Sequence, residues 1–374
     1  MYPEFFVALA VAGVLLTYAN GANDNFKGVA TLHGSGVLSY RTALVSATVA
    51  TWLGSLAALL VAGELVHSFS GKGLVDPQVL SQGTFPVAVA GGAALTVLLA
   101  TRLGLPISTT HALIGALVGA GLSAGELDAT RLWTAFVLPL ALSPVLAATM
   151  AAALYWATGW LRRQWTLESD DCVCLEPAHN GLLAVGVTSW ATSLSTPALR
   201  LGNALSCRIG AMTLPGVSAL DGLGILHCLS GLLVSFARGL NDTPKIAGVL
   251  LIGMSLSTRG QQVTILAVAC VMALGGLLSS RRVARVMSKE ITQLDETRGL
   301  AANLVTSVLV LGASGFGLPV STTHVSCGAF FGIGASSGSG HLPTILTILA
   351  SWFITLPIAA LAAAILHSLS RSLW

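Results

Sequence analysis

Two short motifs place an acid and a base inside stretches that are otherwise apolar. In each, an Asn is followed directly by an Asp, and a Lys stands three residues after the Asp. Ionisable groups inside a membrane are costly and usually serve ion or substrate pathways. The spacing also fits a structural ion pair on one helix face. We expect ion coupling from the six residues Asn23, Asp24, Lys27, Asn241, Asp242 and Lys245.

A second repeated motif reads GLPISTTH at 104–111 and GLPVSTTH at 317–324. A Gly-Leu-Pro turn precedes each Ser, and an apolar helix follows it. The N-terminus of a helix presents free N–H groups and a partial positive charge, so two such ends can bind an anion. Alternatively, each Ser-Thr-Thr only caps its own helix. The expected anion ligands are Ser108, Thr109, Thr110, Ser321, Thr322 and Thr323.

Other polar residues accompany these motifs. His111 and His324 could relay protons, because imidazole titrates near neutral pH, or they could simply bond a neighbour. Arg102 precedes the first Ser-Thr-Thr and could reach the anion, although its side chain could also extend away. The candidate cations are Lys27, Lys245, Arg102 and Arg238. Together with the two Asp carboxylates they leave a net charge of +2, enough to balance a phosphate dianion.

The elements that position these motifs are membrane-spanning helices. The 374 residues are 54% hydrophobic and only 9% charged, which excludes an ordinary soluble protein. The chain holds uncharged runs long enough for spans of roughly 20 residues. Gly and Pro within these runs favour interrupted helices over a barrel, so the fold class is all-α. The runs are 5–23, 43–63, 77–101, 132–161 and 299–370.

The duplicated motifs predict two homologous units. The Asn residues of the acidic motifs are 218 positions apart (23 to 241), and the hairpin serines are 213 apart (108 to 321). Each unit is expected to contain a broken helix, a full span, a re-entrant hairpin and a second span. The boundaries are 1–163 for the first repeat, 164–221 for a partly helical linker and 222–374 for the second repeat.

Loop charges predict that the repeats are inverted in the membrane. The loop after the second span holds only Lys72 in the first unit but Arg281, Arg282, Arg285 and Lys289 in the second. Basic loops stay on the cytoplasmic side. The linker is therefore expected inside and both termini outside, in a multi-pass protein of the cell membrane. Inverted repeats with broken helices are typical of secondary transporters.

No metal site and no nucleic-acid partner are expected. Cys172 and Cys174 form a C-x-C with His179 nearby, but without a second pair this is a weak metal signal. The net charge of +3 says little about partners in a membrane protein.

The paired Gly-x-Asn-Asp and Gly-Leu-Pro-x-Ser-Thr-Thr-His motifs resemble the inorganic phosphate transporter (PiT) family over the whole chain outside the linker. The resemblance implies a homodimer that carries phosphate with Na⁺ or H⁺, in some bacterial members as a metal–phosphate complex. It also implies an anion site at the two Ser-Thr-Thr tips and cation sites at the Asn-Asp pairs.

One departure from the family pattern bears on the coupling ion. Lys27 and Lys245 replace the second Asn of each motif, so an ammonium stands where an amide oxygen could bind Na⁺. The lysines would act as built-in cations and favour proton-driven transport, because a buried lysine can release its proton. Alternatively, they pair structurally with the Asp residues. The substrate also stays open, since some relatives carry sulfate.

The function expected is therefore secondary active, cation-coupled symport of phosphate by alternating access, and not an enzyme activity. An intramembrane hydrolase would use Ser108 or Ser321 with a histidine, but it needs one asymmetric nucleophile and base, whereas these motifs are duplicated. A channel fits ionisable groups at the membrane centre less well than a carrier does.

Overall fold

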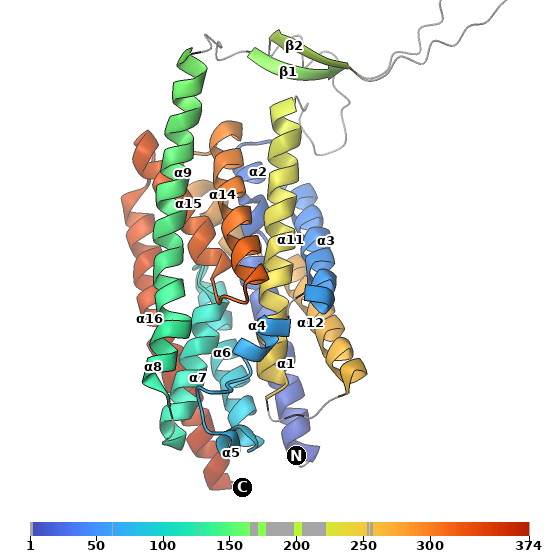
Figure 1. Ribbon diagram of the computed structural model, residues 1–374, viewed down its shortest axis with the longest axis vertical. Helices are drawn as coiled ribbons and strands as arrows, with labels where there is room; N and C mark the ends of the chain where they lie inside the picture. The colour runs from blue at the N-terminus through green and yellow to red at the C-terminus, as the bar shows by residue number, and fades with distance from the viewer. Residues whose placement is uncertain are drawn as a thin grey trace, which may run out of the picture.

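The computed structural model describes residues 3–61, 63–125, 127–164, 171–176, 198–203, 222–252, 254 and 257–373. These form an elongated bundle whose long helices run along its long axis (Figure 1). Within the described ranges, eight helices are long and apolar enough to cross a membrane. The chain is therefore a multi-pass, predominantly helical membrane protein.

The first half contains both long helices and short connecting ones. Its elements are α1 (Pro3–Asp24), η1 (Lys27–Val29), α2 (Ala30–Gly34), α3 (Tyr40–Val61), α4 (Gly63–Ser68), α5 (Pro77–Leu80), α6 (Thr84–Leu103), α7 (Thr109–Ala124), α8 (Ala129–Leu132), η2 (Trp133–Val137) and α9 (Leu138–Gln164).

The second half repeats this order with fewer short helices. Its elements are α11 (Gly222–Leu250), α12 (Thr258–Ser279), α13 (Arg281–Arg285), η3 (Val286–Glu290), α14 (Glu296–Gly315), α15 (Thr322–Ser337) and α16 (Leu342–Leu373).

The described part of the linker forms two strands, β1 (Asp171–Glu176) and β2 (Ala198–Asn203), which pair antiparallel. Within its described residues we find strand and not the helix that we expected. The alternation of Leu199 and Leu201 around Arg200 is a strand pattern that explains the difference. The C-x-C lies on β1, while His179 falls outside the described residues.

The two hairpins approach each other from opposite ends of the bundle. In Figure 1, α6 and α7 lie toward the end that holds both termini, and α14 and α15 lie toward the end that holds the linker sheet. Their tips meet: Thr110 Oγ1 donates to the Val320 carbonyl at 3.4 Å, and Thr323 Oγ1 donates to the Ile107 carbonyl at 2.8 Å. The fold thus brings the two Ser-Thr-Thr motifs together.

Helices of one half pack on helices of the other. α7 packs on α16 and α15 packs on α9, while α1 packs on α12 and α11 on α3. The contacts are close because small residues face them: a Cβ at Gly119 would lie 1.9 Å from the Ala360 carbonyl oxygen, and one at Gly332 would lie 2.1 Å from that of Ala148. Small residues are the usual means of close helix packing in membranes.

Three expectations from sequence were wrong: a first helix broken over 20–25, a broken second helix from 222 to about 253, and a first hairpin arm that starts at Pro77. α1 continues through Asp24, since Asn25 N still donates to the Gly21 carbonyl, and the first broken helix interrupts only at residues 25–26. The second broken helix is not broken, because α11 runs through Pro244. A proline removes only one helical donor, which neighbouring helices can compensate. The first hairpin arm begins at Thr84, after the separate short helix α5.

Candidate anion and cation site

Lys27 lies at the centre of the molecule, where the two hairpin tips meet. Its ammonium donates to Asp24 Oδ1 and to Thr323 Oγ1, and also to Asn23 Oδ1 at 3.2 Å and to the Ile107 carbonyl at 3.0 Å. Its side chain is buried. A lysine of the first half therefore binds the tip of both hairpins.

Lys245 makes the corresponding contacts from the second half. It donates to Thr110 Oγ1 at 3.0 Å and to the Val320 carbonyl, and it lies 3.6 Å from Asp242 Oδ1. Thr110 belongs to the first hairpin and Val320 to the second. Both lysines thus cross from their own half to a threonine of the other, which their sequence spacing alone does not show.

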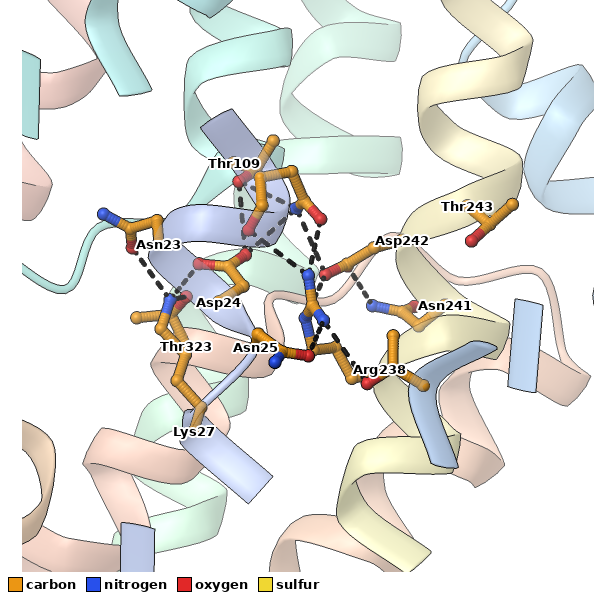
Figure 2. Close-up of polar contacts among 12 residues, drawn as sticks. Asn23, Asp24, Asn25, Lys27, Thr109, Arg238, Asn241, Asp242, Thr243 and Thr323 are labelled. Atoms are coloured by element: carbon orange, nitrogen blue, oxygen red, sulfur yellow. Dashed lines mark hydrogen bonds and ion pairs between the residues drawn. The ribbon is translucent and has the colours of Figure 1, made fainter. Parts of the chain in front are cut away.

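The two carboxylates are linked through Asn20. Its Nδ2 donates to Asp24 Oδ2 at 3.1 Å and to Asp242 Oδ2 at 3.4 Å. The side-chain oxygen of Asn20 accepts a hydrogen bond from Arg238 Nη2 at 2.7 Å, and Arg238 Nε lies 3.6 Å from Asp242 Oδ2. Figure 2 shows Lys27, Asp24 and Thr323 on one side of this cluster and Arg238 with Asp242 on the other.

Asn23 and Asn241 anchor the hairpin tips to the acidic motifs. Asn23 Nδ2 donates to Thr101 Oγ1 and to the Leu105 carbonyl, both at 3.0 Å. Asn241 Nδ2 donates to the Val320 carbonyl at 3.3 Å, and its side-chain oxygen accepts a hydrogen bond from Ser314 at 3.1 Å. Both amides are therefore engaged with the hairpins.

The two tip serines cap their helices. Ser108 Oγ accepts a hydrogen bond from His111 N at 3.0 Å, and Ser321 Oγ accepts one from His324 N at 3.2 Å. The next residue of the first tip, Thr109, donates to Asp24 Oδ2 at 3.2 Å. The capping alternative thus describes the serines here, while the tip threonines face the charged groups. Thr322, which corresponds to Thr109, is also buried.

His111 and His324 meet across the hairpins, with His111 Nδ1 lying 3.0 Å from His324 Nε2. The ring of His324 also stacks on Trp352 at a centroid distance of 3.9 Å. The two histidines therefore form a pair beside the tips, as a relay between the halves would require.

Arg102 is not part of this cluster. Its side chain is exposed, and its carbonyl oxygen accepts a hydrogen bond from Arg282. Without it, the central charges are three cations (Lys27, Lys245 and Arg238) and two carboxylates, which leave a net charge of +1. This differs from the charge of +2 expected from sequence, because the position of Arg102 at the end of α6 directs it outward.

The cluster also contains Asn20, which the sequence offered only as a possible cation ligand, and Arg238, which it offered only as a candidate cation. Asn20 and Arg238 occupy equivalent positions of the two repeats, 218 apart, and they contact each other at 2.7 Å. Each lies three to four residues before an Asn-Asp pair, and this spacing places it on the same helix face as that pair.

Comparisons with known proteins agree with this architecture. The sequence profile described as the phosphate transporter family matches residues 20–363. The chain is 29% identical to the chloroplastic inorganic phosphate transporter 2-1 of Arabidopsis thaliana, over 96% of this chain and 71% of that one. It is 28% identical, over 96% of each chain, to a Pyrococcus abyssi protein with the provisional name phosphate permease.

A solved structure supports the fold. It is titled "The sodium-dependent phosphate transporter", and it matches with a TM-score of 0.75 at 19% sequence identity, covering 99% of this chain and 100% of that one. Because the family profile covers most of the 374 residues, the protein belongs to the phosphate transporter family.

Proposed function

We propose that this protein carries inorganic phosphate across the cell membrane as a cation-coupled symporter that works by alternating access. The anion would bind where the two hairpin tips meet. Since the family is one of transporters, the hydrolase alternative is discarded.

The observation that carries the proposal is the crossed pair of lysine–threonine contacts, Lys27 to Thr323 and Lys245 to Thr110. These contacts place two ammonium groups, two hydroxyls and the N-termini of α7 and α15 around one point. Phosphate oxygens are strong acceptors for all three kinds of donor. On binding, phosphate would replace backbone carbonyls such as that of Val320 as the acceptor of the ammonium groups.

The charge of the cluster favours the phosphate monoanion. With one net positive charge, H₂PO₄⁻ leaves the buried site neutral, whereas HPO₄²⁻ would leave an uncompensated negative charge. Uncompensated buried charge is costly. We therefore take H₂PO₄⁻ as the transported species; the alternative oxyanion, sulfate, is a dianion and is disfavoured by the same charge balance.

The lysines also bear on the coupling ion. Lys27 is surrounded by a carboxylate, an amide, a carbonyl and a hydroxyl oxygen, a set that would suit a monovalent cation. With an ammonium already there, Na⁺ would not be required at this position, and protons would drive transport. The paired His111 and His324 are the proposed relay between the halves.

We place the linker in the cytoplasm and both termini outside. Both termini lie at one end of the bundle and the linker sheet at the other (Figure 1). The basic residues of α13 and η3 follow α12, and η3 contacts α2 toward the linker end. Basic segments favour the cytoplasmic face. We further propose a homodimer, which cross-linking in membranes would test.

The function is tested with purified protein in liposomes. Unlabelled internal phosphate should accelerate uptake of labelled phosphate, as in a carrier but not in a channel. Uptake should persist when choline replaces Na⁺ and should increase with an inward proton gradient. Protein-free liposomes and the double variant Thr110→Ala/Thr323→Ala are the controls. Sulfate exchange without phosphate exchange would refute the substrate, and strict dependence on Na⁺ would refute the coupling ion.

A further inference from the structure

The interface between α11 and α14 contains a second group of buried polar side chains, apart from the hairpin tips. Asn303 Nδ2 donates to Thr31 Oγ1 at 2.9 Å and to Ser230 Oγ at 3.1 Å, and Ser230 donates to the His227 carbonyl at 2.7 Å. All four side chains are at least 96% buried. Polar groups at this depth are unusual unless they have a function or a partner.

The equivalent positions of the first half are apolar. The positions equivalent to His227, Ser230 and Thr31 lie 218 residues away, and those equivalent to residues of α14 lie 213 residues away. All are apolar and belong to one buried cluster: Leu9, Ala12, Val249, Ala90, Ala93 and Ala94. The corresponding residues of the second half are His227, Ser230, Thr31, Asn303, Thr306 and Ser307. At these positions one interface is thus apolar and its counterpart is polar.

Three polar atoms in the polar interface have no hydrogen-bond partner among the described residues. They are both ring nitrogens of His227, which is 0% exposed, and the hydroxyl of Ser307, which is 1% exposed. The imidazole lies tightly against α14, since a Cβ at Gly299 would lie 2.3 Å from His227 Nε2. Such groups are expected to bind water or a proton, because an unsatisfied buried polar group is costly.

The polar residues continue along α14 toward the central cluster, with the buried Val310 between Ser307 and Ser314. On α14, Asn303, Ser307 and Ser314 are separated by four and then seven positions, so they share one helix face. Ser314 donates to Asn241, and Asn241 Nδ2 lies 3.2 Å from Asp242 Oδ1. The other end of this polar group lies near the start of α11, on the linker side (Figure 1).

We propose that this interface is the path by which the coupling proton passes between the central cluster and the linker side, with His227 as its outer carrier. This rests on the proposed proton-coupled phosphate transport. The imidazole accepts a proton at one nitrogen from water in the path and releases it to water at the linker end, with no net change in the histidine.

Several charged and titratable groups lie on the elements that pack around this end of α11. They are Cys228 on α11, Glu296 and Arg298 on α14 with its N-cap Asp295, His33 on α2, Tyr40 and Arg41 on α3, Lys27 on η1, and Asp171, Cys172, Cys174 and Glu176 on β1. Of these, Arg298 pairs with Asp295 at 3.2 Å.

The first test replaces His227 with leucine, the residue at its equivalent position in the first half. Phosphate counterflow should change less than about twofold, since exchange does not require the proton to leave, while proton-driven net uptake should fall by roughly tenfold or more. The control is His367→Leu, another fully buried histidine whose equivalent, Leu154, is also leucine. It should leave both rates near wild type.

The variant His227→Gln separates a carrier from a packing residue. Glutamine keeps polarity but cannot carry a proton, so it should lose net uptake as leucine does. Recovery of net uptake with glutamine, or an equal loss of counterflow in both variants, would overturn the proposal. Absence of phosphate counterflow in the wild type would instead refute the proposed function.

Access of water to the path is tested with paired cysteines in a background that lacks the six native ones. Ser307→Cys should react with a small cationic methanethiosulfonate added at the linker side. Ala94→Cys, at the equivalent and equally buried position, should stay unreactive to the same reagent added at either side, including the end that holds the termini. Equal labelling of the two would contradict a path confined to one interface.

Discussion

The two lysines of the site occupy equivalent positions, yet their surroundings differ. Lys27 is bonded directly to Asp24, whose second oxygen accepts hydrogen bonds, among the described residues, from the neutral Asn20 and Thr109. In the other half, Asp242 has two cations at 3.6 Å, Lys245 and Arg238. This difference between the two carboxylates comes from one position, because Arg238 stands where the first half has the neutral Asn20.

The difference indicates that the two acidic motifs do not depend equally on their lysines. Asp24 relies on one close cation, while Asp242 shares two more distant ones. Removal of one partner from a buried ion pair is strongly destabilising, because it leaves an uncompensated charge. The duplicated motif therefore supplies one carboxylate paired with a single lysine and one that lies near two cations.

The largest effect is expected from Lys27→Ala. It should lower the free energy of unfolding by about 3–5 kcal/mol, because Asp24 loses its direct partner. Lys245→Ala should cost less, since Arg238 still faces Asp242. Chemical unfolding of the purified variants in detergent measures both values.

The difference in cost between the two lysine variants can be removed by one further substitution. Arg238→Asn gives the second half the residue of the first, and in that background Lys245→Ala should become as costly as Lys27→Ala. If the two lysine variants are equally destabilised in the original background, the assigned role of Arg238 is wrong.

A smaller effect is expected at the hairpin hydroxyls. Hydrogen bonds to a charged group contribute about 1.5–3 kcal/mol, so Thr323→Ala or Thr110→Ala should weaken phosphate binding by roughly tenfold or more. Isothermal titration of the purified variants measures this. The conservative changes to serine, which keep the hydroxyl, should bind like wild type, and unchanged affinity in both alanine variants would exclude these residues from the anion site.

A change in the coupling ion is expected from Lys27→Asn. The amide restores an oxygen ligand and removes the built-in cation, so uptake should become stimulated by Na⁺, whereas the wild type should work in choline. Stimulation by Na⁺ should be larger in Lys27→Asn than in Lys245→Asn, because Asp242 keeps Arg238 nearby. Uptake that ignores Na⁺ in both variants would mean that the lysines only support the structure.

The smallest perturbation is a topology test at exposed positions. With the native cysteines replaced, Lys72→Cys should react with an impermeant reagent from outside and Arg285→Cys only from inside. Transport should be unaffected, because both residues are exposed. Reaction of both from the same face would refute the proposed inversion of the halves.

Much of the architecture could be predicted from sequence because the signals are local. Long uncharged runs indicate membrane helices, and duplicated motifs indicate two units. The Gly-Leu-Pro turn before each Ser-Thr-Thr predicted the hairpin tips, and the helices after them start at Thr109 and Thr322. These features depend on neighbours within a few residues.

The tertiary structure decided how those parts meet. Sequence spacing pairs Lys27 with Asp24, but only the opposed hairpins bring it to Thr323, 296 residues away. The same packing leaves Arg102 exposed and lets α11 continue through Pro244, because neighbouring helices set the surroundings of each side chain. The polar group between α11 and α14 also depends on contacts between separate helices, which no local pattern specifies.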